Sequence, residues 1–426
     1  MTETIFALSS GSPPAAIAVI RISGPAAGDV VLAMSGRLPP PRRAVFSRVH
    51  DLSGRLLDQA MVLWLPGPAN ATGEDCAEFH LHGGRAVVAA VEHALERFPG
   101  LRRALPGEFT RRAFQNGRID LAEAEGLADL LEAETELQLQ AALAMASGRF
   151  SAEIELWRET LLVLSAQVEA ALDFSDEDDV EQALPESFTW NIERLRAEIS
   201  LRLSRPHAEL LREGFRVVLA GPPNAGKSTL FNALVESDAA ITSPYAGTTR
   251  DVLTRPVAIE GVPFLFLDTA GLHAGGNDEI ERIGMERARG ELDRADLVLW
   301  LGSSAECPPG AWDIEAQCDR SGHEAKPSGR HKVSAATGEG LDILRRDLVA
   351  TARGALPHPG EAALNTRQAR LLHDAEVALG NAANLLDPLL VAENLRLARV
   401  AFDALLGRTT TEDMLDALFG RFCIGK

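Results

Sequence analysis

Residues 221–228 match the phosphate-binding pattern G-x-x-x-x-G-K-[ST] at every fixed position. An apolar run at 215–220 predicts a buried strand before this loop, and residues 229–234 predict the first turns of a helix after it. In such a loop the backbone N–H groups turn toward phosphate oxygens, and the helix N-terminus adds partial positive charge. Lys227 would reach the β and γ phosphates, and Ser228 would ligate Mg²⁺. The strand-loop-helix context favours a nucleotide-binding loop over a chance glycine-rich turn.

Three further motifs follow in the order that GTP-binding domains use. A threonine in the motif at 247–251 can close over the γ phosphate and offer Mg²⁺ a second oxygen. Asp268 ends a predicted strand at 262–267 and would hold Mg²⁺ through water. Residues 334–340 match the base-contacting loop of GTPases. The residues that these motifs and the residual base signature at 316–319 offer to the nucleotide are Asn224, Ala225, Gly226, Lys227, Ser228, Thr229, Thr248, Thr249, Asp268, Thr269, Ala270, Gly271, Asp319, Ser334, Ala335 and Ala336.

Two positions depart from common GTPase patterns. Leu272 stands where Ras-type enzymes place a glutamine that orients water, so the catalytic group must come from elsewhere. The carboxylates of 278–282 are candidates, although acids are also favoured at any helix N-terminus. The guanine-reading signature is reduced to residues 316–319, of which only Asp319 keeps the usual type. No clear apolar strand precedes it, and we expect 303–332 to be rich in loops.

Composition limits the class of protein. A chain of 426 residues is expected to form two or three domains, and its net charge of −19 argues against a protein coated in nucleic acid. Any RNA contact must therefore use a local basic patch or a basic partner. The four cysteines show neither metal-ligand spacing nor a disulfide framework, which suits a reducing cytosol. The N-terminus lacks the pattern of a signal peptide, and no apolar run approaches the ~20 residues of a membrane span, so we expect a cytoplasmic protein.

The chain around the nucleotide motifs divides by pattern. Residues 1–118 mix β-like runs, turns and one helical stretch, which predicts an α+β domain in which Arg21 interrupts an apolar strand. Residues 119–212 and 358–426 are helical by spacing. The simplest arrangement is one helical domain made from both flanks, with an α/β P-loop GTPase domain at 213–357 inserted between them. His80 and His82 would share one face of a strand, but two histidines are too few for a metal site.

The motifs together resemble those of the MnmE (TrmE) family of tRNA-modification GTPases. The resemblance covers essentially the whole chain and is carried by residues 106–110, 223–228, 246–251, 268–272, 281–284 and, above all, the C-terminal 422–426. It implies an N-terminal tetrahydrofolate-binding domain that forms a homodimer, a helical domain and a potassium-dependent GTPase. With an FAD-containing partner, MnmG (GidA), such a protein uses 5-formyl- or methylene-tetrahydrofolate to place a carboxymethylaminomethyl-type group on C5 of the wobble uridine (U34) of tRNA.

The resemblance also implies roles for single residues. Glu281 would act on the attacking water through a further water, and Cys423 is a second catalytic candidate whose chemical role stays open. Folate would be contacted by Arg21, Glu78 and Arg118, with Lys426 approaching the same site. Potassium would be surrounded by Asn224, Ser243, Tyr245 and Thr248, and Mg²⁺ would be held by Ser228 and Thr249. Arg118 and Ser243 replace a lysine and a threonine that are frequent in the family.

A second interpretation is a regulatory or ribosome-assembly GTPase that acts as a switch without one-carbon chemistry. The domain before residue 119 and the C-terminal Cys423 separate the two interpretations, because a pure switch needs neither.

Overall fold

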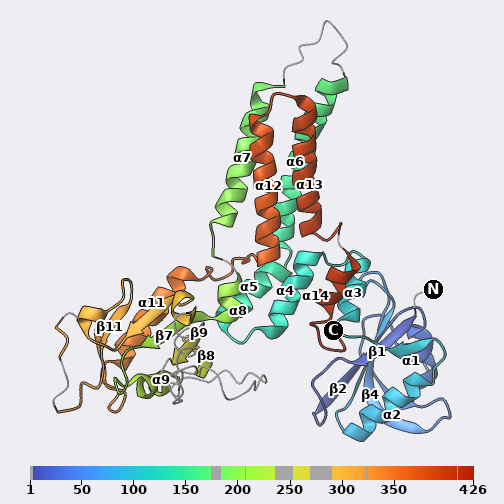
Figure 1. Ribbon diagram of the computed structural model, residues 1–426. Helices are drawn as coiled ribbons and strands as arrows, with labels where there is room; N and C mark the ends of the chain where they lie inside the picture. Colours follow the sequence, from blue (N-terminus) through green and yellow to red (C-terminus); the bar gives the residue numbers. More distant parts are fainter. Residues whose placement is uncertain are drawn as a thin grey trace, which may run out of the picture. The chain divides into compact units, whose positions relative to one another are not determined.

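The computed structural model describes residues 3–173, 184–206, 208–235, 253–268, 290–321, 325–327, 329–409 and 411–426. The chain forms two compact units, one of Met1–Ala128 with Asp403–Lys426 and one of Asp129–Phe402, and each is described by itself. Figure 1 shows the elements of both units. Within the described ranges, none of the helices combines the length and apolar character that a bilayer crossing requires.

The first unit contains a six-stranded sheet. Its strands, in the order β3-β4-β5-β2-β1-β6, are β3 (Val45–His50), β4 (Leu56–Leu65), β5 (Cys76–His82), β2 (Ile17–Ser23), β1 (Thr4–Leu8) and β6 (Leu101–Arg103). Neighbours are antiparallel except β1 and β6. Because side chains alternate along a strand, Ile20 and Ile22 of β2 enter the core while Arg21 faces the other side.

Helices cover this sheet unequally. The helices α1 (Ala27–Ser35) and α2 (Arg85–Glu96) pack on the face that holds Ile20 and Phe79. The helices α3 (Glu108–Gln115) and α14 (Glu412–Phe419) pack together, with the rings of Phe114 and Phe419 6.1 Å apart, and α4 (Leu121–Glu132) starts beside them. Residues that are 300 positions apart therefore share one small core, which fixes the C-terminus on this unit.

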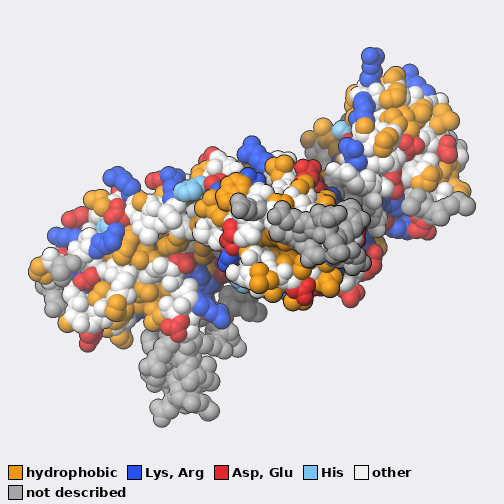
Figure 2. Space-filling model, turned by 90° about the horizontal axis from the view of Figure 1, so that it is seen from above, with side chains coloured by type: hydrophobic (Ala, Val, Ile, Leu, Met, Phe, Trp, Pro, Cys, Tyr) orange, Lys and Arg blue, Asp and Glu red, His pale blue; other side chains and the backbone are white. Residues whose placement is uncertain are grey.

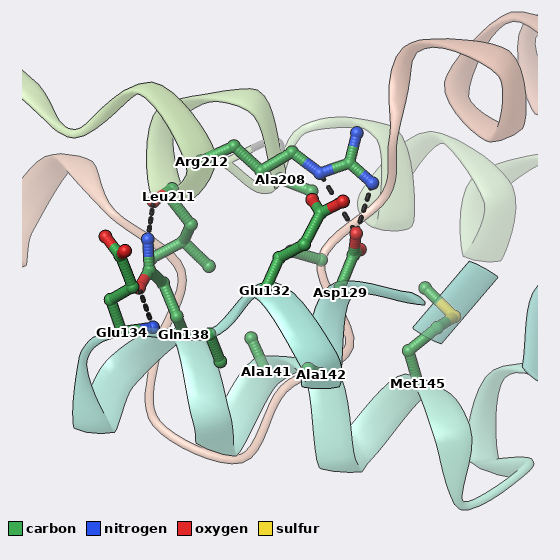
Figure 3. Close-up of a pocket in the computed structure, with 12 residues that line it drawn as sticks. Asp129, Glu132, Glu134, Gln138, Ala141, Ala142, Met145, Ala208, Leu211 and Arg212 are labelled. Carbon is green, nitrogen blue, oxygen red and sulfur yellow. Dashed lines mark hydrogen bonds and ion pairs between the residues drawn. The ribbon is translucent and has the colours of Figure 1, made fainter. Parts of the chain in front are cut away.

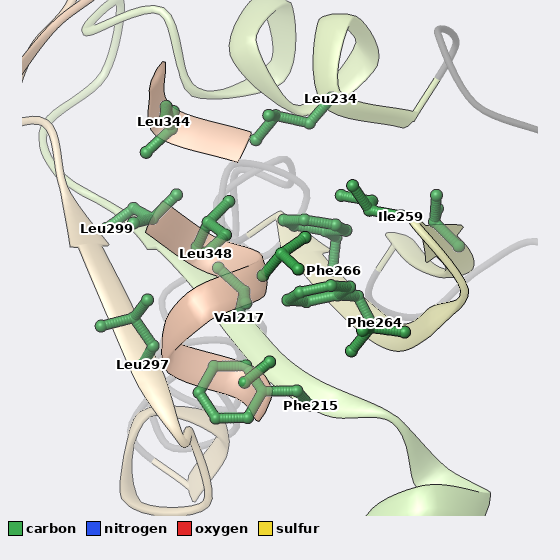
Figure 4. Packing of buried hydrophobic residues seen from close by; sticks show 14 of the residues in the cluster. Phe215, Val217, Leu234, Ile259, Phe264, Phe266, Leu297, Leu299, Leu344 and Leu348 are labelled. Atoms are coloured by element: carbon green, nitrogen blue, oxygen red, sulfur yellow. The ribbon is translucent and has the colours of Figure 1, made fainter. Parts of the chain in front are cut away.

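The second unit contains the sheet predicted for the GTPase fold. Its strands, in the order β12-β11-β10-β7-β9-β8, are β12 (His331–Lys332), β11 (Trp312–Glu315), β10 (Leu297–Trp300), β7 (Phe215–Ala220), β9 (Val262–Asp268) and β8 (Leu253–Ile259). All neighbours are parallel except β8 and β9. Helices α9 (Lys227–Val235) and α11 (Leu341–Ala355) contribute to a core in which Phe264 stacks on Phe266 at 5.7 Å, with Leu344 and Leu348 nearby (Figure 4).

Long helices make up the rest of this unit. They are α5 (Glu136–Ala146), α6 (Arg149–Asp173), α7 (Glu186–Leu203), α8 (Ala208–Glu213), α12 (Thr366–Asn384) and α13 (Pro388–Leu405), with a short 3-10 turn, η2 (Ser304–Glu306), in the sheet region. Helices α6, α7, α12 and α13 lie side by side as a bundle (Figure 1), and Trp157 meets Phe402 at 6.2 Å. The sheet is inserted between α8 and α12, so the predicted combination of an α+β domain, a helical domain and an inserted P-loop fold is confirmed.

One expectation about this sheet was wrong. Residues 303–332 are rich in loops, as predicted, but the strand β11 directly precedes Ala316, where no strand was expected, and pairs in parallel with β10 and β12. The strand β11 escaped the sequence pattern because two of its four residues are acidic. Lys326 contacts both carboxylates: its Nζ lies 2.6 Å from Asp313 Oδ1, and its backbone N–H donates to Glu315 Oε2 at 2.9 Å.

Candidate functional site

The phosphate-binding loop joins β7 to α9, as its sequence predicts. The Nζ of Lys227 donates to the carbonyl oxygens of Gly221 and Pro222, each at 2.8 Å. Burial lowers the pKa of Lys227, and the carboxylate of Asp268 partly offsets this effect. Asn224 has a left-handed backbone with φ of 64°, which turns the loop tightly. Because this ammonium lies at the start of a helix, it is well placed to exchange the loop carbonyls for the oxygens of a bound phosphate.

Ser228 and Asp268 meet at the start of α9 and the end of β9. The Ser228 hydroxyl donates to Asp268 Oδ2 at 2.6 Å, and Asp268 is buried. A hydroxyl and a carboxylate are both oxygen ligands of the kind that Mg²⁺ prefers. No group of three or more His, Cys, Asp or Glu side chains gathers as a metal site within the described ranges. The oxygen pair therefore fits an ion whose other ligands come from phosphate and water.

The base-reading residues gather beside this loop. Asp319 Oδ1 accepts a hydrogen bond of 2.6 Å from the Ser334 hydroxyl. A cavity between the loops is lined by residues from all three predicted nucleotide segments, including Gly226, Thr229, Asp319, Ala335 and Ala336. Ala225 of the same loop packs against the hydrophobic core of this sheet. The structure thus brings together residues that are up to 110 positions apart in the sequence.

Sequence reasoning missed one contact in this site. The side-chain amide of Gln317 donates to the carbonyl of Asn224 at 3.3 Å. A Cβ on Gly226 would lie 2.8 Å from the same amide nitrogen and would displace it, and the φ of 90° at Gly226 also favours glycine. The pairing has no local sequence signal, because Gln317 stands where a lysine is common and lies 93 positions from Asn224. Predicted residues outside the described ranges are Ser243, Tyr245, Thr248, Thr249, Thr269, Ala270, Gly271 and Glu281.

In the first unit, Arg21 and Glu78 lie opposite one another on β2 and β5. Arg21 donates to Glu78 Oε1 from Nε at 3.0 Å, and His80 Nε2 lies 3.0 Å from Glu78 Oε2. Burial would raise the pKa of the Glu78 carboxyl, but the hydrogen bond from His80 and the charge of Arg21 outweigh it, so this pKa lies below its usual value. Both side chains are partly exposed, at 27% for Arg21 and 15% for Glu78, on the sheet face away from α1 and α2.

The C-terminal residues lie beside this ion pair. Phe109 donates its backbone N–H to the carbonyl of Lys426 at 3.2 Å, and the Arg21 guanidinium sits 5.8 Å from the centre of the Phe109 ring. Cys423 is exposed, and its carbonyl accepts from the N–H of Lys426 at 3.2 Å. Arg118 instead donates from Nε to the carbonyl of Asn70 at 3.2 Å. Its described contacts do not include Arg21 or Glu78. Of the four predicted folate residues, the structure therefore pairs Arg21 with Glu78 and places the backbone of Lys426 on Phe109, whose ring faces Arg21.

A separate cavity of about 150 Å³ lies between α4, α5 and α8 (Figure 3). Arg212 Nε donates to Asp129 Oδ1 at 3.0 Å, and Gln138 Nε2 donates to the carbonyl of Leu211 at 2.7 Å. Burial opposes the charge of Arg212, but the neighbouring carboxylates raise its pKa above its usual value. These contacts hold α8, and with it the start of β7, against α4 and α5. None of the predicted site residues lines this cavity.

The strand, loop and helix around Lys227, with Ser228 on Asp268 and Ser334 on Asp319, define a P-loop GTPase domain. Residues 4–118 match the family model described as the GTP-binding protein TrmE N-terminus, and residues 121–423 match the MnmE helical domain. The chain therefore belongs to the MnmE family.

Relatives and solved structures give the extent of the similarity. The protein named tRNA modification GTPase MnmE from Erythrobacter litoralis is 62% identical over 424 residues, covering all of both chains. The protein of the same name from Novosphingobium aromaticivorans is 62% identical over 437 aligned positions, again covering all of both chains. The G domain of the T. maritima FeoB iron transporter is 27% identical, covers 32% of this chain and 98% of its own, and has a TM-score of 0.24.

Proposed function

We propose that this chain hydrolyses GTP and uses that reaction to drive modification of C5 of the wobble uridine (U34) in tRNA. The observation that carries the proposal is the 62% identity along the full length of two relatives named tRNA modification GTPase MnmE. The Ser228–Asp268 pair and the Asp319–Ser334 pair support it, because they are the groups that a guanine nucleotide and its metal require.

In this proposal each nucleotide group has a partner. Lys227 exchanges its loop carbonyls for phosphate oxygens, and Asp319 accepts from the two donors on the guanine edge. Ser228 would hold Mg²⁺ with Thr249, and Asp268 would stand behind it through water. Bound Mg²⁺ neutralises charge on the phosphates.

Two further roles fall on residues outside the described ranges. Glu281 would act on the attacking water. The proposed potassium ligands are Asn224, Ser243, Tyr245 and Thr248. Of these four, Asn224 lies in the described loop, where its left-handed backbone places it at the tight turn of the phosphate loop.

A tetrahydrofolate is the proposed one-carbon donor, bound by the first unit. Glu78 is ionised and exposed enough to accept from adjacent pterin donors, and Arg21, Arg118 and Lys426 offer positive groups to the carboxylates of the folate tail. The contact between Phe109 and Lys426 places the C-terminus near Arg21. Cys423, exposed on the same tail, is the proposed second reactive residue.

The proposed assembly is a homodimer through residues 1–118 that works with the FAD-containing MnmG (GidA) subunit in the cytoplasm. Three apolar side chains support the dimer: Ile17, Phe46 and Met61 are 58%, 59% and 38% exposed, and strand register places them on the sheet face of Arg21. Within this assembly we assign residues 1–118 to folate, 119–212 and 358–426 to the helical domain, and 213–357 to GTP.

The test is analysis of wobble uridines in tRNA from cells that lack this chain. Loss of the modified nucleoside, restored by the wild-type chain but not by Lys227→Ala, is the expected result. If the level of the modified nucleoside in cells that lack the chain equals the level in the parent strain, the proposal is contradicted. Purified wild-type protein must also hydrolyse GTP, and Lys227→Ala must not.

A further inference from the structure

Residues 30–50 form the most basic uninterrupted part of the first unit. The stretch contains Arg37, Arg42, Arg43, Arg48 and His50 and no acidic residue, although the whole chain carries a net charge of −19. Figure 2 shows blue and red side chains interspersed over most of the visible surface. A region that can attract a polyanion must therefore be local, and this stretch, which runs from α1 through β3, is the clearest candidate. We call it the α1–β3 basic edge.

The arginines of the α1–β3 basic edge are exposed, and none has an acidic partner among the described residues. Several other arginines of the same unit are neutralised, as in the pairs of Arg102 with Glu108 at 2.6 Å and Arg112 with Glu74 at 2.7 Å. Among the described residues, no carboxylate forms an ion pair with any of the four arginines of the edge. Arg37 and Arg42 each give one guanidinium donor to a backbone carbonyl, of Phe46 and Ala69, but the charges of all four can still act on another molecule. The four residues are Arg37, Arg42, Arg43 and Arg48.

Backbone contacts hold this edge in a defined shape. The strand β3 pairs with β4 alone, so its other side is open. Arg42 has a left-handed backbone with φ of 61°, donates its N–H to the carbonyl of Trp64 at 2.8 Å, and its guanidinium donates to the carbonyl of Ala69. Three consecutive prolines at 39–41 restrict the loop before it. Arginine side chains on a fixed backbone lose less freedom on binding than those on a mobile tail.

We propose that the α1–β3 basic edge binds the phosphate backbone of tRNA. The inference rests on the proposed function, which makes tRNA the substrate, and adds where the substrate is held. The guanidinium group pairs with phosphate in two parallel hydrogen bonds, and each phosphate contact releases a counterion. Such contacts position RNA without reading its sequence. The acidic remainder of the chain repels the same polyanion, so it favours approach along this edge.

The experiment measures the affinity of labelled tRNA for the full chain across a range of salt concentrations. The variant is Arg43→Gln with Arg48→Gln, because neither side chain has a hydrogen bond or ion pair with a described residue, so the fold should be kept. Each lost phosphate contact lowers the slope of log affinity against log salt by about 1, so a slope reduced by about 2 and weaker binding at low salt are expected. Arg97→Gln is the matched control: this exposed arginine lies after α2 and also lacks an ion pair, and its slope should equal that of the wild type.

Each other outcome has a definite meaning. A double variant with the slope of the wild type would overturn the α1–β3 basic edge while leaving the proposed function intact. Failure of the wild-type chain to bind tRNA at all would also overturn the α1–β3 basic edge, whereas the proposed function would still be decided by the wobble-uridine analysis, because a basic partner can supply the RNA contact. Arg48 shares the exposed face of β3 with Phe46, which we assign to the homodimer, so light scattering is part of the test. Loss of protomer association in the double variant would identify the edge as a contact between copies of the chain. Loss of cosedimentation with phosphatidylserine vesicles, with tRNA binding unchanged, would assign it to a lipid surface.

Discussion

Gln317 and Asn224 join the base-reading loop to the phosphate-binding loop through one hydrogen bond of 3.3 Å. Both residues have left-handed backbones, with φ of 58° and 64°, so each loop turns sharply where it meets the other. The Gln317 side chain occupies the space that a Cβ on Gly226 would need. A neutral amide thus connects the two loops in a chain that has Gln317 where a lysine is common and Ala316 where an asparagine is common.

Gln317→Ala should weaken the binding of both GTP and GDP. A neutral hydrogen bond contributes about 0.5–1.5 kcal/mol, so the dissociation constants should rise by up to roughly tenfold. Titration with a fluorescent guanine nucleotide measures this directly. Gln317→Lys is the control, because its ammonium can still reach the Asn224 carbonyl and it should bind at least as tightly as the wild type. Equal affinity in Gln317→Ala and the wild type would show that the contact does not support the site.

Asp319→Asn should shift the base preference from guanine toward xanthine. The carboxylate accepts from two donors on guanine, and xanthine places an oxygen where guanine has its amino group. Sites built around such hydrogen bonds discriminate strongly when a partner is lost. Competition between GTP and xanthosine triphosphate for the purified variant measures the shift. Unchanged affinities for both nucleotides would show that Asp319, despite its bond to Ser334, does not read the base.

The sequence predicted the structure well where a motif and the strand and helix that flank it are adjacent in the chain. The strand, loop and helix around Lys227 follow directly from the residue pattern, and the class of fold follows with them. The contacts that assemble the site are less predictable, because they join segments such as Gln317 and Asn224 that are 93 positions apart. The strand β11 was missed for a related reason: of its two acidic residues, Asp313 pairs with the ammonium of Lys326 and Glu315 accepts from the Lys326 backbone N–H, and Lys326 lies more than ten positions away in the sequence.

Arg21→Ala should strongly weaken binding of 5-formyltetrahydrofolate, and Glu78→Ala should do the same. Arg21 and Glu78 fix one another on neighbouring strands, so each change also leaves its partner unpaired on the sheet. Calorimetry gives the affinities, and Arg55→Ala is the control because that arginine pairs with Asp51 at the β3–β4 turn. Wild-type affinity in both site variants would refute the proposed folate site.

The Glu78 ion pair should also make stability depend on pH. Because the pKa of Glu78 is lowered in the folded chain, the unfolded state binds a proton first as the pH falls. The stabilisation is therefore present above the ordinary carboxyl pKa and is lost as the pH falls through the lowered value. Urea unfolding of the wild type and Glu78→Gln should differ most near neutral pH and converge in acid. A difference that does not shrink in acid would contradict this interpretation of the ion pair.

GTP turnover should be much faster in potassium than in sodium at equal ionic strength. Leu272 cannot orient water, and the proposed cation beside Asn224 would offset charge near the β–γ bridge as an arginine finger does, an effect worth roughly 10³–10⁵ in rate. Steady-state phosphate release in the two chloride salts tests this. Asn224→Ala should reduce the difference, and equal wild-type rates in both salts would exclude a potassium-dependent mechanism.

Gly425→Ala should displace the C-terminal tail and weaken folate binding without changing GTP turnover. Gly425 has φ of 99°, which disfavours any residue with a Cβ, and that Cβ would overlap the carbonyl oxygen of Leu8 and lie 2.9 Å from the Cα of Ser9. The tail cannot shift without breaking the bond from the Phe109 N–H to the Lys426 carbonyl. Carboxypeptidase should therefore remove Lys426 faster from the variant, and calorimetry should show weaker binding of 5-formyltetrahydrofolate. Ile424→Ala is the control, since its side chain is 58% exposed and its loss leaves the backbone path intact. If Gly425→Ala kept wild-type folate affinity while its tail became protease-sensitive, Lys426 would have no part in the folate site.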